Sequence, residues 1–84
     1  MALVHVAAGR NDVETLRRLL DEKPELVEAR CGWQRSRPLH DACEEGSLEA
    51  ACLLLDRGAA IEARDRYGDT PFMLACYAGR VDVV

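Results

Sequence analysis

Apolar residues recur along the chain at intervals of three and four, the spacing that places side chains on one face of an α-helix. Leu39, Ala42 and Cys43 form one such stripe, short enough for about two turns of helix. Longer stripes predict two further helices, formed by Val13, Leu16, Leu19 and Leu20 and by Leu48, Ala51, Leu54 and Leu55. The pattern therefore predicts short amphipathic helices and an all-α fold.

Residues typical of helix ends flank these stripes. Thr70-Pro71 reads as an N-cap followed by proline at the first helical position, where the missing N–H costs nothing. Gly46 and Gly79 stand where a short helix would end in a left-handed residue, and Asn11 occupies the same place earlier in the chain. Gly58 is expected to end the helix before it. Each short helix is thus followed by a tight turn and a second helix.

The helical pairs are internal repeats. Four residues recur identically after a shift of 33 positions: Pro38, Ala42, Cys43 and Gly46 fall on Pro71, Ala75, Cys76 and Gly79. A shift of 35 places His40 on His5, so the two extra residues lie between Leu20 and Arg37, where Pro24 breaks any helix. Repeats that accept an insertion in one loop are helical hairpins joined by loops, and about two and a half of them are present.

These residues resemble the ankyrin repeat family. Residues 65–80 are similar to the family pattern D-x-x-G-x-T-P-L-H-x-A-A-x-x-G-H, and residues 38–46 and 53–59 match it again. The resemblance implies an all-α ankyrin-repeat solenoid of stacked helix-turn-helix units with protruding hairpin loops. It implies a single region over residues 1–84, with units of about 2–30, 31–63 and an incomplete 64–84. It also implies that His5 and His40 bond the backbone of neighbouring loops, whereas Arg37 and Met73 replace the usual threonine and histidine.

Composition excludes several classes of function. Fifteen acidic residues against eleven Lys and Arg give a net charge of -4, which counts against nucleic-acid binding. No apolar run approaches the roughly 18 residues of a membrane span. Four cysteines without CxxC spacing are typical of reduced thiols in an intracellular protein, cytoplasmic or nuclear. We expect a monomer, with association through an uncapped C-terminal end as the alternative.

The candidates for chemistry are few. Cys31 with His5 or His40 is the one nucleophile–base combination, but no glycine-rich elbow or helix start accompanies it. His40 and Cys43 offer two metal ligands, which do not complete a tetrahedral site. No P-loop, dinucleotide fingerprint or HExxH sequence is present. We therefore expect no catalytic residue, cofactor or metal, and a thiol enzyme using Cys31 is the remote alternative.

Function is then expected from the surface. The resemblance implies that a protein partner contacts the hairpin tips and the solvent side of each first helix, on the concave face of the array. In this sequence those positions are Trp33, Gln34, Ser36, Glu44, Glu45, Arg66, Tyr67, Asp69, Tyr77 and Ala78. Trp33, Tyr67 and Tyr77 are the expected anchors, because a few aromatic residues usually dominate binding energy. Trp33 has a second interpretation, packing on Leu39 or near Pro24.

Basic and acidic residues form two separate clusters in the same region of the chain. Three arginines (residues 30, 35 and 37) cluster at the first hairpin, and three acidic residues (41, 44 and 45) lie on the adjoining helix. One interpretation is a self-compensating, solvated surface. The other is that the acidic helix face attracts a partner with a basic segment and the arginines an acidic one.

The leading hypothesis is a non-catalytic protein–protein interaction module. The alternative is a substrate-recruiting segment of a larger protein such as a ubiquitin-ligase adaptor, because residues 36–43 are similar to units in such adaptors. An array usually needs about three repeats, so the chain is expected to be a fragment of a longer array, with a C-terminal part that frays from about Phe72.

Overall fold

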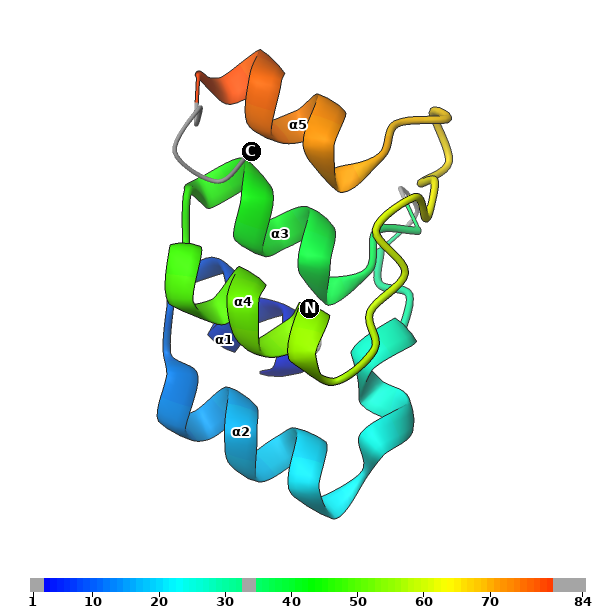
Figure 1. The fold of residues 1–84 in the computed structure, drawn as a ribbon. Helices are drawn as coiled ribbons and strands as arrows, with labels where there is room; N and C mark the ends of the chain where they lie inside the picture. Colours follow the sequence, from blue (N-terminus) through cyan, green and yellow to red (C-terminus); the bar gives the residue numbers. More distant parts are fainter. Residues whose placement is uncertain (1–2, 33–34, 80–84) are drawn as a thin grey trace.

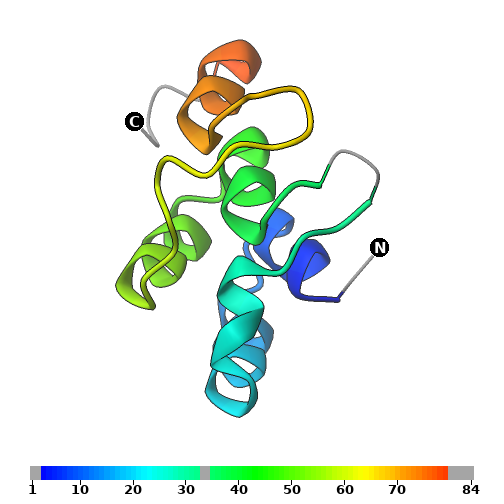
Figure 2. The ribbon, with the colours of Figure 1, turned by 90° about the vertical axis from the view of Figure 1, so that its right-hand side faces the viewer.

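The computed structural model describes residues 3–32 and 35–79 and consists of helices joined by short loops. They are α1 (Leu3–Gly9), α2 (Val13–Glu22), the 3-10 helix η1 (Pro24–Glu28), α3 (Pro38–Glu45), α4 (Leu48–Asp56) and α5 (Pro71–Ala78). Helix α3 packs between α1 and α5, while α2 and α4 form a second layer beside them (Figures 1 and 2). The arrangement confirms the predicted all-α solenoid of helix-turn-helix units.

The expected residues end the helices. Asn11, Gly46 and Gly79 have φ angles of 59°, 74° and 75°, which confirms the predicted left-handed turn after each first helix. Thr70 caps α5, because its side-chain oxygen accepts a hydrogen bond from the Met73 N–H at 3.2 Å. These local signals are independent of tertiary packing, which is why the sequence alone identifies them.

The turns also tie one unit to the next. The Asn11 side-chain oxygen accepts a hydrogen bond from the Ala50 N–H at 2.9 Å, and the Ser47 hydroxyl donates to the Gly9 carbonyl at 2.7 Å. Both bonds cross from the first unit to the second, so they fix the spacing between stacked turns. Such contacts between neighbouring repeats are what hold a solenoid together.

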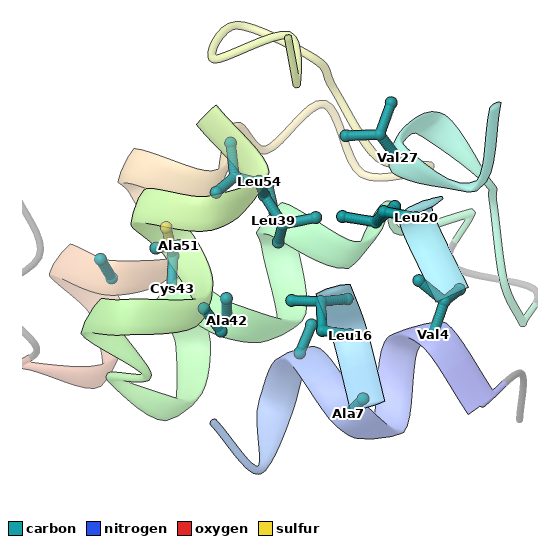
Figure 3. Packing of buried hydrophobic residues seen from close by; sticks show 13 residues of the cluster. Val4, Ala7, Leu16, Leu20, Val27, Leu39, Ala42, Cys43, Ala51 and Leu54 are labelled. Carbon is teal, nitrogen blue, oxygen red and sulfur yellow. The ribbon is translucent and has the colours of Figure 1, made fainter. Parts of the chain in front are cut away.

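Small side chains let the helices approach closely. Ala8, Ala42, Ala50 and Ala75 are completely buried, and larger side chains fill the space between the layers (Figure 3). The larger residues include Leu16, Leu20, Leu39 and Leu54 from three different helices. In the described part of the chain, aliphatic rather than aromatic side chains build this core. Cys76 on α5 is exposed.

The buried face of α4 agrees only in part with the predicted stripe. Ala51 and Leu54 are buried as predicted, but Leu48 and Leu55 are 43% and 42% exposed, and Ala50 is completely buried. Residues 50–55 of this helix are apolar throughout, so periodicity alone does not select a face. Packing against the neighbouring helices α2 and α3 selects the buried side.

The segment after α2 also contains more structure than predicted. Helix α2 ends before Pro24 as expected, but Pro24 then begins η1, since proline at a first helical position requires no N–H partner. Val27 on this element is buried in the core. The Glu28 carboxylate accepts hydrogen bonds from Arg37 Nη1 at 2.7 Å and from the Ala60 N–H at 3.2 Å. The segment that contains the insertion is therefore ordered, and η1 connects the first unit to the second through these contacts.

Candidate protein-binding face

Two buried histidines hold the loops that border the candidate site. His5 Nε2 donates to the Ser36 carbonyl and His40 Nε2 to the Asp69 carbonyl, each at 2.9 Å. The His40 Nδ1 atom accepts from the Arg37 N–H at 3.1 Å, so the proton of the neutral ring is on Nε2. These bonds confirm the structural role that the resemblance implied for His5 and His40. They also supply the cap of α3 that the Arg37 side chain does not provide.

The same geometry bears on the thiol-enzyme alternative. Both nitrogen atoms of His40 are engaged in hydrogen bonds, so this ring is not placed to activate Cys31 as a general base. The Nε2 atom of His5 is bonded to the Ser36 carbonyl, and burial lowers the pKa of this ring, which makes it a weaker base.

The loop before α5 is held by its own backbone and one carboxylate. Asp65 Oδ1 accepts from the N–H groups of Tyr67 and Asp69, both at 2.9 Å. Gly68 has a φ of 81°, and its N–H donates to the Asp65 carbonyl at 3.0 Å. This turn presents Tyr67, whose side chain is largely exposed, beside α3. The tip is thus ordered before any partner binds.

A hollow of about 280 Å³ lies between α3, α5 and these two loops. We call it the α3–α5 hollow, and its lining consists of Cys31, Gly32, Ser36, Asp41, Glu44, Asp65, Tyr67, Asp69 and Leu74. A second hollow of about 290 Å³, the α1–α3 hollow, is lined by His5, Val6, Gly9, Arg10, Asp41, Glu44 and Glu45. Asp41 and Glu44 line both, so the two hollows adjoin along the solvent side of α3. Together they form a hollowed face over the first helices of the units.

Asp41 is the unusual charged group of this face. Its Oδ2 atom is buried and has no hydrogen-bond partner among the described residues. Burial, together with the smaller effect of the Glu44 and Glu45 carboxylates, raises the pKa of this carboxyl group to about 7. The side chain is therefore held where ionisation is unfavourable, at the point that the two hollows share.

Asp41→Asn is expected to stabilise the fold above pH 7 and to leave it unchanged near pH 3. Because the folded pKa of about 7 exceeds the ordinary 3.8, the unfolded chain releases this proton first as the pH rises. The wild-type protein therefore loses stability between about pH 4 and pH 7, and the variant does not. Since Asp41 is only half-buried, solvent screening limits the gain to about 1–2 kcal/mol. Urea unfolding at the two pH values measures it, and an equal difference at both would contradict the assignment.

The structure brings together about half of the residues that the sequence placed at the partner surface. Ser36, Glu44, Tyr67 and Asp69 line the α3–α5 hollow, and Glu45 lines the α1–α3 hollow. Arg66, Tyr77 and Ala78 are exposed but line neither hollow. Trp33 and Gln34 lie outside the described residues, so both interpretations of Trp33 stay open.

Several lining residues were not among the predicted site residues, and in the α3–α5 hollow they are Cys31, Gly32, Asp41, Asp65 and Leu74. Asp41 belongs to the acidic group of α3 that the sequence singled out, so its charge gave a signal although its burial did not. Asp65 was not predicted as a site residue because its position indicates a turn, and Leu74 was not predicted because it lies in an apolar stretch. Their proximity arises from stacking of one unit on the next.

The arginine group is only partly available to a partner. Arg37 is paired with Glu28 at 2.7 Å, and its side chain is largely buried. Arg30 and Arg35 are exposed. The charge of Arg37 is thus neutralised by Glu28 on η1 and not by the acidic residues of α3. This disfavours the interpretation in which the arginine cluster and the acidic cluster neutralise each other.

Other chemistry finds little support in the described part of the chain. No group of three His, Cys, Asp or Glu side chains is arranged to hold a metal ion within residues 3–32 and 35–79. Burial raises the pKa of the Cys43 thiol to about 11, which disfavours the thiolate that metals and electrophiles require. No helix in the described part is long and apolar enough to span a membrane.

The fold and its hollowed face define a class: a solenoid of stacked helical hairpins that presents first helices and loops to solvent. A family model described as ankyrin repeats (3 copies) matches residues 4–84. The chain belongs to the ankyrin repeat family. Ankyrin repeats are protein-interaction modules, and this chain is such a module.

Relatives carry the same segment inside much longer proteins. The chain is 37% identical over 78 residues to E3 ubiquitin-protein ligase XB3 of Oryza sativa subsp. japonica, covering 93% of this chain and 17% of the relative. It is 41% identical over 64 residues to serine/threonine-protein kinase VIK of Arabidopsis thaliana, covering 76% and 14%. Identity is 34% over 73 residues to putative E3 ubiquitin-protein ligase XBAT31 of Arabidopsis thaliana, covering 87% and 16%. The chain thus spans less than one fifth of the length of each of these curated relatives.

Proposed function

We propose that the hollowed face of α1, α3 and α5, with the loops before α3 and α5, binds a protein partner of this chain. The observation that carries the proposal is the pair of adjoining hollows along α3, bordered by loops that histidine hydrogen bonds already hold in place. A preordered surface loses little conformational entropy on binding. We also propose that this interaction takes place inside the cell, in the cytoplasm or the nucleus. The chain is proposed to bind its partner as a monomer.

Two exposed tyrosines supply the anchors in this proposal. Tyr67 is 59% exposed at the loop tip, and Tyr77 is 72% exposed near the end of α5. Tyrosine offers a large contact area at low entropic cost, and the hydroxyl keeps it compatible with water before binding. Such residues account for most of the energy in many interfaces.

Changing Tyr67 and Tyr77 together to alanine is expected to reduce capture of the partner by at least about tenfold. Stability should change little because both side chains are exposed. The measurement is quantitative affinity capture by the full chain, followed by comparison of recovered proteins by mass spectrometry. The matched control is Leu48→Ala with Leu55→Ala, since these exposed side chains lie on α4, outside the proposed face. Unchanged capture by the tyrosine variant, or equal loss in the control, would refute the placement.

A second candidate is recruitment of substrates to a ubiquitin ligase. It is supported by the relatives named E3 ubiquitin-protein ligases, whose matched part is this same segment. The kinase relative supports the more general function, since it carries a similar segment in a different kind of protein. The discriminating observation is whether the full-length protein forms ubiquitin conjugates with E1 and E2 enzymes. Conjugates that depend on this segment would favour recruitment of substrates to a ubiquitin ligase. If no conjugates form, general protein binding is the function that remains.

A further inference from the structure

Four exposed apolar residues of the second and third units repeat buried residues of the first and second. Residues 27–30 (Val-Glu-Ala-Arg) recur at 61–64 as Ile-Glu-Ala-Arg, and the shifts of 35 and 33 relate the helices before and after them. The buried set, in which each side chain is at most 7% exposed, is Leu20, Val27, Leu39 and Cys43. The repeated set, in which every side chain is exposed, is Leu55, Ile61, Phe72 and Cys76. We call the repeated set the α4–α5 surface.

Helix α4 covers the buried set. The four buried residues lie in one core cluster with Ala51 and Leu54 of α4 (Figure 3). This helix contacts both α2 and α3, which carry three of the four. Helix α5 is the last helix of the described part, so no described helix takes the equivalent place beside α4 and α5 (Figure 1). The repeat therefore indicates what fits the α4–α5 surface, which is a helix that resembles α4.

The edge of the surface repeats one member of an ion pair as well. Arg57, at the end of α4, pairs through Nη1 with Asp21 Oδ1 of α2 at 2.8 Å. Asp56 lies 35 positions after Asp21 and is exposed, and no ion pair joins it to another described residue. A helix that lies against α4 as α4 lies against α2 would bring a basic residue at its end next to Asp56. Charge complementarity thus adds to the apolar contacts.

We infer that the α4–α5 surface binds an amphipathic helix of a partner protein. The expected pattern in that helix is the one that α4 carries: two adjacent small residues, leucine three positions after the second, and a basic residue three positions after the leucine. Recognition of a helix through its apolar face is a recurring mode of peptide binding. The interaction is separate from the proposed function, because no residue of the α4–α5 surface lines either hollow.

The probe is a peptide with the sequence of residues 47–58, acetylated and amidated. A hydrocarbon staple joins positions 48 and 52, which are exposed on α4. The staple is needed because so short a helix is marginal in water. The matched control is the same stapled peptide with Leu54→Asp, which places a charge on the face that α4 buries.

Titration of the peptide into the ¹⁵N-labelled full chain should shift the amides of residues 55–63 and 72–76. The Leu54→Asp peptide should leave them unchanged. Absence of shifts at these residues would overturn the inference. Shifts centred on Leu20 and Val27 would also overturn it, because they would show that the peptide displaces the chain's own α4.

Two aromatic residues of α5 provide a matched pair of variants. Phe72→Ser should weaken binding of the peptide by at least about tenfold, since it removes an aromatic anchor of the surface. Tyr77, five positions later, is still more exposed and points to a different side of α5. Tyr77→Ser should therefore change binding by less than about twofold. Equal weakening by both variants would overturn the inference, and the wild-type shifts decide alone if a variant does not fold.

The basic residue of the helix is tested by charge exchange. A peptide with Arg57→Asp should bind the wild-type chain about threefold more weakly, because an exposed ion pair contributes modestly. The variant Asp56→Arg should restore its binding. No loss, or a loss that Asp56→Arg does not restore, would overturn the inferred place of the basic residue.

Two further measurements address other occupants of the surface. Cys76 should react with iodoacetamide in the free chain, and saturating peptide should slow this reaction by at least about fivefold. Cys52 should react at an unchanged rate, because its counterpart in the first unit, Arg17, stays exposed beside α4. A Cys76 that does not react in the free chain would show that the chain itself covers the surface. A dimer that Phe72→Ser dissociates in sedimentation would show that a second copy covers it, and either result would overturn the inference.

Failure here is distinguishable from failure of the proposed function. The variant with Tyr67 and Tyr77 changed to alanine should bind the peptide as the wild-type chain does, because neither tyrosine belongs to the α4–α5 surface. In the capture experiment, a protein is assigned to the hollowed face only if the tyrosine variant loses it and the variant of Leu48 and Leu55 retains it.

Discussion

His40→Ala is expected to unfold a large fraction of the chain at 25 °C. The ring is completely buried, accepts a hydrogen bond from the Arg37 N–H and donates one to the Asp69 carbonyl. Its removal leaves both backbone groups without these partners and opens a cavity, at a combined cost of about 3–5 kcal/mol. A domain of this size is stable by only roughly 5 kcal/mol. Urea unfolding followed by circular dichroism measures the loss.

The matched control is Met73→Ala, at the equivalent position of the next unit. Met73 is only half-buried, and the N-cap of its helix is supplied by Thr70. The cost there should stay below about 2 kcal/mol. Equal losses at His40 and Met73 would show that the loop-to-helix hydrogen bonds contribute little.

Leu54→Ala is expected to destabilise the fold by about 2.5–5 kcal/mol, whereas Leu55→Ala should cost less than about 1 kcal/mol. The two leucines are neighbours on α4 and undergo the same chemical change. Leu54 is completely buried between the layers, and Leu55 is 42% exposed. Only the buried side chain leaves a cavity when it is truncated. Chemical denaturation of both variants under one set of conditions tests the difference.

Comparable losses at the two positions would contradict the orientation of α4. They would instead match the apolar stripe that the sequence predicted, which contains both leucines. A larger loss at Leu55 than at Leu54 would show that a different side of α4 is buried.

The repeat architecture is predictable because its signals are local. The left-handed residues Asn11, Gly46 and Gly79, the Thr70 cap and the two histidines each act within a few residues of the chain or at a fixed repeat spacing. Composition and periodicity therefore suffice to place most helix boundaries. The helix ends agree with the structure where the chemistry of capping determines them.

The parts that were missed depend on contacts distant in sequence. The face of α4 is selected by its neighbour, since its own sequence is apolar on several sides. Helix η1 gains its order from Val27 in the core and from the Glu28 bonds to Arg37 and Ala60. Neither influence leaves a periodic pattern in the segment itself.

The candidate site shows the same division. Loop tips and first helices were expected at the surface, and Tyr67 and Asp69 lie there. The α3–α5 hollow exists because Asp41 and Asp65, far apart in sequence, are brought together by stacking of two units. The burial of one Asp41 oxygen is likewise a product of packing.

The most direct test of the account is an amide NMR map of the ¹⁵N-labelled full chain with a partner protein recovered by the capture experiment. The account predicts that the largest shifts fall on α3, on α5 and on residues 65–69, around the two hollows. Shifts confined to the outer surfaces of α2 and α4, with the hollowed face unchanged, would contradict it.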